Sequence, residues 1–183
     1  MNIAQSVVLV TGANRGLGFA LVEAALAAKA KKVYAAARNP RALDALVARA
    51  AGRVVPLQLD VTSAREIEAA AQIAGDVSLL LNNAGVLASY NLLDSSRAQI
   101  EQDMAVNFYG TLAVTKAFVP ALERAKGAVV NVLTVVSLAS RPMIGGYAAA
   151  KAAAFSATQA LRPELKAKGI DVHAASPARS TPT

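Results

Sequence analysis

The chain has 183 residues and a formal net charge of +7, with 55% hydrophobic residues, one histidine and no cysteine. This length and hydrophobic content are typical of one globular domain over residues 1–183. The lack of cysteine excludes disulfides, and because there is also only one histidine we expect no metal site. The basic residues form no stripe with aromatic residues, so we expect no nucleic-acid partner. No apolar run is long enough to cross a membrane, so we expect no membrane partner. No cationic leader precedes the first apolar run, and we therefore expect a cytoplasmic location.

Apolar runs of strand type alternate with segments of helical period along the whole chain. Strands are predicted at residues 6–10, 32–36, 54–59, 77–81, 128–133 and 171–175. Helices are predicted at residues 17–28, 41–50, 63–74, 97–124 with a break near Asn107, and 146–168. Because such βαβ units connect with right-handed crossovers, we predict an α/β fold with a doubly wound parallel sheet of about six strands and helices on both faces.

A glycine turn follows the first predicted strand. Gly12, Gly16 and Gly18 let the backbone turn sharply and approach an anion at the positive end of the next helix. The spacing predicts a phosphate-binding cradle, and the alternative for this segment alone is an ordinary strand–turn–helix with incidental glycines.

Polar, charged, glycine or proline residues follow the other predicted strands, which are themselves mostly apolar. Ligands of doubly wound sheets bind beyond the carboxyl ends of the strands, so residues in these positions are expected to meet at one edge. They are Arg38 after the second strand, Asp60 after the third, Asn82-Asn-Ala-Gly85 after the fourth, Thr134 after the fifth and Pro177 after the sixth.

Five motifs in order make the chain resemble the short-chain dehydrogenase/reductase family over about residues 7–177. They are Thr11-Gly-Ala-Asn-Arg-Gly-Leu-Gly18, Asp60-Val61, Asn82-Asn-Ala-Gly85, Asn107 and Tyr147-Ala-Ala-Ala-Lys151. The resemblance implies a Rossmann-like fold, a nicotinamide cofactor and reversible carbonyl/alcohol chemistry on a small-molecule substrate. The cofactor-binding residues expected here are Gly12, Asn14, Arg15, Gly16, Leu17, Gly18, Arg38, Asp60, Val61, Asn83, Ala84, Gly85, Tyr147, Lys151 and Pro177.

The residue after the second strand indicates which cofactor is used. An acid about 20 positions past the glycine turn binds the ribose hydroxyls of NAD, whereas this chain has Arg38 there and Arg15 inside the turn. A guanidinium can bind a 2′-phosphate in bidentate fashion, so NADP(H) is predicted. The alternative is that Arg38 is only a solvated charge at a strand end.

Tyr147 and Lys151 are spaced i, i+4, which places them on one face of the predicted helix. A nearby ammonium favours the phenolate of a tyrosine, so Tyr147 is expected to be the acid/base and Lys151 its electrostatic support. By the resemblance, Asn107 anchors a water near the lysine, and a hydroxyl 13 residues before the tyrosine binds the substrate oxygen. That position holds Thr134, with Ser137 as the competing candidate.

The end of the chain departs from the family pattern. Family members run on beyond this length, so the last family strand and the helical substrate lid are expected to be lacking. The family's Pro-Gly reads Pro177-Ala178, and Thr181 and Thr183 flank the expected threonine position. Pro163 inside the last predicted helix should cost about 3 kcal/mol unless the helix kinks.

These features lead to two functional hypotheses. The first is an NADPH-dependent oxidoreductase that transfers a hydride between the nicotinamide and a carbonyl or alcohol substrate, expected as a homodimer or homotetramer. The second is a catalytically weak NADP-binding module that acts as a sensor or interaction subunit.

Overall fold

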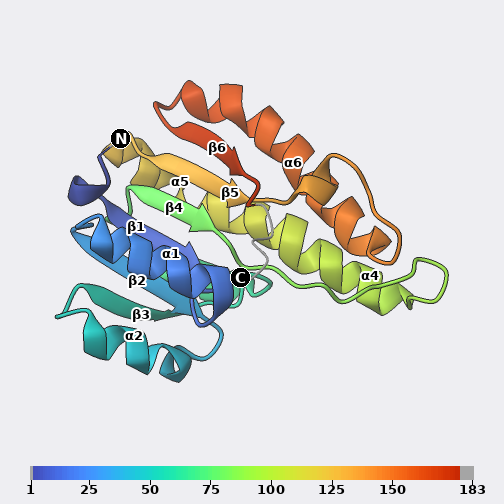
Figure 1. Ribbon diagram of the computed structural model, residues 1–183. Helices are drawn as coiled ribbons and strands as arrows, with labels where there is room; N and C mark the ends of the chain where they lie inside the picture. The colour runs from blue at the N-terminus through green and yellow to red at the C-terminus, as the bar shows by residue number, and fades with distance from the viewer. Residues whose placement is uncertain (1, 178–183) are drawn as a thin grey trace.

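The computed structural model describes residues 2–177, and its centre is a parallel sheet (Figure 1). The six strands stand in the order β3-β2-β1-β4-β5-β6, and every neighbouring pair is parallel. The direction of winding reverses between β1 and β4, so the predicted doubly wound sheet is confirmed. The strands are β1 (Val7–Thr11), β2 (Lys32–Ala37), β3 (Val54–Gln58), β4 (Leu79–Asn82), β5 (Ala128–Val132) and β6 (Asp171–Ala175).

Within residues 2–177, six α-helices and three short helical segments connect the strands, and a fourth short segment precedes β1. The α-helices are α1 (Gly16–Ala27), α2 (Asp44–Arg49), α3 (Ala64–Ile73), α4 (Arg97–Met104), α5 (Thr111–Ala125) and α6 (Gly145–Lys166). The short segments are the 3₁₀ turns η1 (Ile3–Gln5), η2 (Pro40–Leu43) and η4 (Val135–Ser137), and the π-helical segment η3 (Ala105–Gly110).

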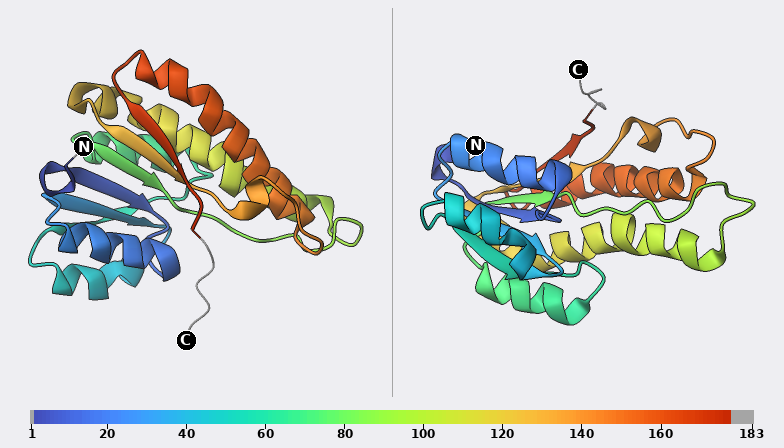
Figure 2. Two further views of the ribbon diagram at one scale, coloured as in Figure 1. Left: turned by 45° about the horizontal axis from the view of Figure 1, so that its top comes forward. Right: turned by 60° about the horizontal axis from the view of Figure 1, so that its bottom comes forward.

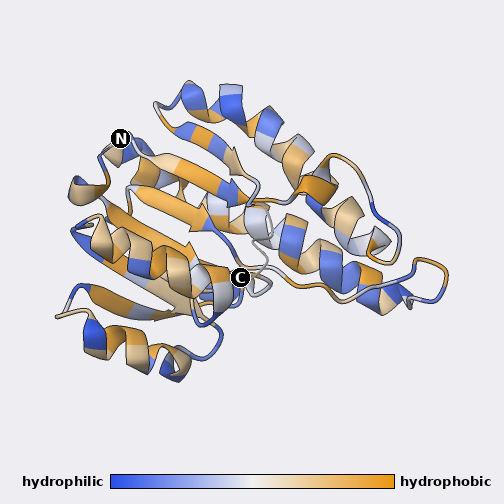
Figure 3. Ribbon diagram, viewed as in Figure 1, coloured by the Kyte–Doolittle hydropathy of each residue, from blue (hydrophilic) through white to orange (hydrophobic). Residues whose placement is uncertain are grey.

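The helices cover both faces of the sheet, as predicted (Figure 2). Because successive strand residues point to opposite faces, Val8 and Val10 pack in the core under α1 and α2. Val7 and Leu9 pack in the core formed with α3, α5 and α6. The strands are therefore apolar on both sides, and Figure 3 shows them mostly in the hydrophobic colour.

Some predicted boundaries were wrong. The predicted helix 41–50 is split, because the Asn39 side chain accepts the Arg41 N–H and a 3₁₀ turn precedes α2. The fourth strand begins at Leu79 rather than residue 77, and the hydroxyl of Ser78 accepts the N–H of Val7 at 3.0 Å. The break predicted near Asn107 is confirmed by η3 between α4 and α5. Pro163 lies in the last turn of α6, which continues to Lys166.

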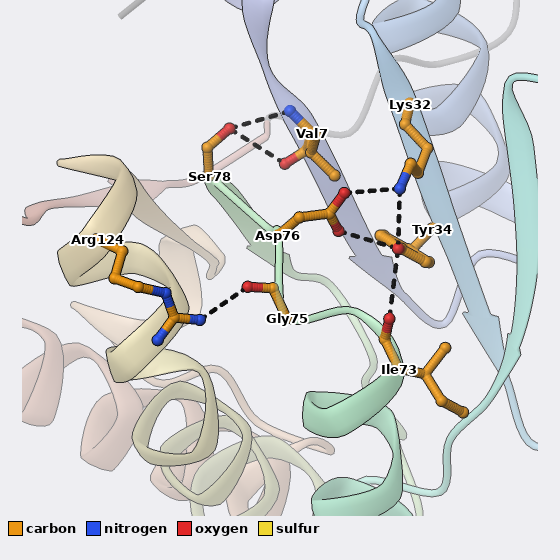
Figure 4. Close-up of polar contacts among 8 residues, drawn as sticks. All are labelled: Val7, Lys32, Tyr34, Ile73, Gly75, Asp76, Ser78 and Arg124. Carbon is orange, nitrogen blue, oxygen red and sulfur yellow. Dashed lines mark hydrogen bonds and ion pairs between the residues drawn. The ribbon is translucent and has the colours of Figure 1, made fainter.

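The amino ends of the strands carry a polar cluster that lies away from the carboxyl edge (Figure 4). Nζ of Lys32 lies 2.6 Å from Oδ2 of Asp76, and the hydroxyl of Tyr34 donates to Oδ1 of Asp76 at 2.9 Å. Arg124 donates to the carbonyl of Gly75 at 2.9 Å. These contacts tie the turn before β4 to β2 and α5.

The expectations for Ala178, Thr181 and Thr183 fall outside residues 2–177. Within that range, no helix has the length and apolar character that a membrane span requires.

Candidate active site

The glycine turn between β1 and α1 forms an open cradle. Gly12 and Gly16 have left-handed backbones, with φ of +65° and +55°. A Cβ on Gly12 would lie 3.0 Å from Cα of Ala84, and one on Gly18 would clash with the carbonyl oxygen of Gly12. No side chain caps the amino end of α1, whose N-cap Arg15 is extended. The first-turn N–H groups of α1 are therefore available to an anion, as a dinucleotide phosphate requires.

Thr11 fastens the segment after β4 to this turn. Its hydroxyl accepts the N–H groups of Asn83 and Ala84, both at 2.9 Å. Nδ2 of Asn83 donates to the carbonyl of Thr11 at 2.9 Å. This contact places Asn83, Ala84 and Gly85 beside the glycine turn. We did not predict a site role for Thr11, although it is the first residue of the glycine motif.

A cavity of about 840 Å³ lies beyond the carboxyl ends of β1, β2, β3 and β4. It brings together every predicted cofactor-binding residue that precedes position 100. They are Gly12, Asn14, Arg15, Gly16, Leu17, Gly18, Arg38, Asp60, Val61, Asn83, Ala84 and Gly85.

The two arginines of this cavity are exposed, whereas the acid beside them is held in place. Within residues 2–177, neither Arg15 nor Arg38 forms an ion pair. Oδ1 of Asp60 accepts the N–H and the hydroxyl of Thr62 at 2.9 and 2.7 Å. Partial burial raises the pKa of Asp60, but these two hydrogen bonds and the charge of Arg38 together hold it below its ordinary value. The cationic groups are thus free to meet a phosphate.

A second cavity, of about 390 Å³, adjoins the first and contains the predicted catalytic groups. Leu17, Asn83, Gly85 and Val86 line both cavities. The remaining residues around the second cavity are Leu87, Val132, Leu133, Thr134, Tyr147, Lys151 and Pro177. Three of the four predicted catalytic residues and all three remaining cofactor residues therefore meet here.

Lys151 is 5% exposed, and its Nζ donates to the carbonyl of Val132 at 3.0 Å. Nζ lies 5.9 Å from the ring centroid of Tyr147. Burial lowers the pKa of Lys151 to about 8. For Tyr147, burial first and the charge of Asp103 second raise the pKa above its ordinary value. The phenol is therefore protonated at neutral pH in this structure, and the expected phenolate-favouring effect of Lys151 does not prevail here.

Asn107 lies behind these groups rather than on the cavity wall. Its side chain is buried and pairs with the backbone of Val86, donating to the carbonyl at 2.8 Å and accepting the N–H at 3.2 Å. A Cβ on Gly85 would lie 3.0 Å from Oδ1 of Asn107 and 3.7 Å from Nζ of Lys151. Gly85 thus leaves room for the side chain of Asn107 beside the segment after β4. The role of Asn107 as a water anchor stays a prediction.

The two hydroxyl candidates after β5 occupy different places. Thr134 lines the second cavity, at the end of β5. Ser137 is buried in η4, and its hydroxyl accepts the N–H of Thr134 at 3.3 Å. This geometry supports Thr134 as the donor to substrate and gives Ser137 a role in holding the turn.

Comparison with known proteins adds independent findings. A family model described as short chain dehydrogenase matches residues 6–182. The 2-(S)-hydroxypropyl-CoM dehydrogenase 3 of Xanthobacter autotrophicus is 33% identical, with 99% of this chain and 74% of the relative covered. The NADPH-dependent 1-acyldihydroxyacetone phosphate reductase of Schizosaccharomyces pombe is 37% identical, with 92% and 58% covered.

Two solved structures are also similar. A short chain dehydrogenase from Burkholderia cenocepacia in complex with NADP has a TM-score of 0.91 at 38% identity, with 97% of this chain and 73% of that chain covered. An NADPH-bound short chain oxidoreductase from Pseudomonas aeruginosa, described as having an atypical catalytic center, has a TM-score of 0.85 at 28% identity, with 93% and 70% covered. This chain thus spans 58% to 74% of the length of the four proteins named.

Proposed function

Because the chain belongs to the short-chain dehydrogenase family, we propose that it is an NADPH-dependent oxidoreductase acting on a carbonyl or alcohol substrate. The observation that carries this proposal is the junction of the two cavities. The glycine cradle and two free arginines line one, while Tyr147, Lys151 and Thr134 line the other. A molecule that fills the first cavity can extend past Asn83 and Gly85 to the catalytic groups.

The residues present fit a phosphorylated dinucleotide. The open backbone at Gly16 and the uncapped first turn of α1 suit the pyrophosphate. Arg15 and Arg38 suit the 2′-phosphate, since each charge-assisted hydrogen bond contributes about 1.5–3 kcal/mol. The NADP and NADPH bound to the two solved relatives support this choice of cofactor. When bound, NADPH would supply the hydride.

The chain's own residues would handle the proton and the substrate oxygen. Tyr147 is protonated at neutral pH and can donate its proton to the carbonyl oxygen as that oxygen gains negative charge. The hydroxyl of Thr134 would donate a hydrogen bond to the same oxygen. The buried ammonium of Lys151 would stabilise the phenolate that remains on Tyr147. A protonated tyrosine is the form that reduction requires, whereas oxidation of an alcohol would require the phenolate.

Steady-state oxidation of NADPH against a panel of aldehydes and ketones, together with NADPH titration by fluorescence, tests the proposal. We expect saturable binding and turnover of at least one class of carbonyl compound. Binding with no turnover across the panel would instead favour an NADP-binding module that acts as a sensor or interaction subunit. Failure to bind NADPH would contradict both functions.

A further inference from the structure

Asp103 is a buried carboxylate that the proposed chemistry does not use. It lies on α4, and within residues 2–177 it is the one acidic residue in the buried set. Its Oδ1 accepts the N–H of Ala88 at 2.9 Å. Its Oδ2 accepts the N–H of Ser89 at 3.0 Å and the hydroxyl of Ser89 at 2.5 Å. All three partners are donors, so both oxygens of the carboxylate act as acceptors here.

Asp103 and Asn107 together hold one stretch of backbone. They are four residues apart, so they lie on the same face of the helix. Asn107 pairs with the N–H and carbonyl of Val86, and Asp103 accepts the N–H groups of Ala88 and Ser89. The segment 86–89 therefore obtains from these two side chains the hydrogen bonds that a neighbouring strand would otherwise supply. Val86 and Leu87 in this segment line the catalytic cavity.

The same segment packs on the first turn of α6, immediately before Tyr147. A Cβ on Gly146 would overlap the hydroxyl of Ser89 and would lie 3.4 Å from Oδ2 of Asp103. A Cβ on Gly145 would lie 2.6 Å from Cγ of Leu92. Figure 2 shows α4 and the start of α6 running side by side beyond the strands, and the two helices are in contact. Gly146 thus permits an approach of the buried Ser89 to α6 that a side chain at this position would block.

We propose that Asp103 is a positioning residue, whose carboxylate holds segment 86–89 on α4, where Ser89 packs on the first turn of α6, and so fixes Tyr147 relative to the cavity wall. This inference rests on the proposed function, in which Tyr147 is the proton donor. The charged groups facing Tyr147 are Lys151 on its own helix and Asp103 on α4. The other residues lining its cavity are uncharged; they are Leu17, Asn83, Gly85, residues 86–87 and 132–134, and Pro177. Asp103 therefore acts on both the place and the ionisation of the phenol.

The variant Asp103→Asn tests this inference without any substrate. Asparagine keeps the size of the side chain but replaces one acceptor oxygen by a donor that faces other donors. We expect faster amide hydrogen exchange in residues 86–90. We also expect the phenol of Tyr147 to titrate at a lower pH, because a negative charge that opposes the phenolate is removed. Phenolate absorbance is measured against pH for each protein and for the same protein carrying Tyr147→Phe, and the difference between the two curves is the titration of Tyr147.

Two further variants separate positioning from general effects. Glu101→Gln makes the same change of charge on α4, but Glu101 is exposed and paired with Arg97, so neither measurement should change. Ser89→Ala keeps the charge of Asp103 and both N–H bonds, so Tyr147 should titrate as in the wild type.

The inference is overturned if folded Asp103→Asn leaves either the exchange of residues 86–90 or the Tyr147 titration unchanged, or if Glu101→Gln shifts the titration equally. If Asp103→Asn does not fold, Asp103→Glu decides, because the longer acid keeps the charge and displaces the contact. Faster exchange in residues 86–90 with an unshifted titration would then support the inference, and unchanged exchange would overturn it. Neither measurement needs turnover, so inactivity toward carbonyl compounds would contradict the proposed function and not this inference.

Discussion

At the scale of single residues, charge and hydroxyl placement distinguish this site from a generic nucleotide cavity. Arg38 stands at the end of β2, where an acid would repel a 2′-phosphate, and the cavity's own acid, Asp60, is hydrogen bonded to Thr62. Thr134 lines the second cavity, whereas Ser137 lies in the turn behind it and accepts the N–H of Thr134. Each of these placements makes a separate prediction.

Arg38→Ala should weaken NADPH binding at least tenfold and change NADH binding little, because only NADPH carries the 2′-phosphate. Fluorescence titration of both cofactors measures the difference. Arg41→Ala is the matched control, since Arg41 is an exposed cation of η2 outside the cavity lining. Unchanged NADPH affinity in Arg38→Ala would refute the cofactor assignment.

Tyr147→Phe should lower kcat/KM about 100-fold or more and leave NADPH affinity within a few-fold, because only the transferable proton is removed. Steady-state kinetics with a substrate found in the carbonyl panel measures the loss. Substantial residual turnover would exclude Tyr147 as the proton donor.

Thr134→Ala should raise the barrier by about 2–4 kcal/mol, since its hydroxyl would meet the developing oxyanion. Ser137→Ala should affect the rate much less, because Ser137 lies outside the cavity and supports the N–H of Thr134. The ratio of kcat values for the two variants decides between them. The opposite ratio would assign the donor role to Ser137.

At the scale of elements, the sequence was most informative where a strand ends in a motif. β6 has the predicted bounds, and the break at Asn107 appears as η3. That the expected cofactor residues meet at one cavity could be predicted, because parallel strands place their carboxyl ends on one edge. The roles of Thr11 and Asp103 could not, because each depends on contact between segments distant in sequence, with no local pattern to reveal it.

Asp76→Asn should lower stability near neutral pH through loss of the contacts that tie the α3–β4 turn to β2. The ion pair itself contributes only about 0.2–1 kcal/mol, because both side chains are partly exposed. Partial burial raises the pKa of Asp76, but the hydrogen bonds from Lys32 and Tyr34 and the charge of Lys32 hold it below its ordinary value.

A lowered folded-state pKa stabilises the protein above the unfolded pKa, and the contribution is lost as pH falls through the folded pKa. The difference between wild type and Asp76→Asn should therefore be present at about pH 7 and shrink toward about pH 3. Urea unfolding at the two pH values measures it. The exposed acid Glu68 on α3 provides the control variant Glu68→Gln, and a difference that grew on acidification would contradict the assignment.

At the scale of the whole molecule, the cavity beside the glycine turn joins the two halves of the doubly wound sheet. Arg38 follows β2 in one half, and Asn83 follows β4 in the other. A ligand bound across this junction contacts both halves at once, so it should stabilise the fold as one unit. The expected homodimer or homotetramer stays a prediction that sedimentation would decide. Within residues 2–177, β3 and β6 are the two edge strands of the sheet.

NADPH should therefore raise the melting temperature more than an equal concentration of NADH. At 100 times its Kd, NADPH contributes about 2.7 kcal/mol, and a tenfold weaker NADH contributes about 1.4 kcal/mol. For a chain of this size the difference corresponds to about 3–5 °C, which differential scanning fluorimetry resolves. Arg38→Ala should remove the advantage of NADPH, and Arg41→Ala should keep it. Equal shifts for the two cofactors in the wild-type protein would show that the arginines do not select the 2′-phosphate, even if both cofactors bind in the cradle.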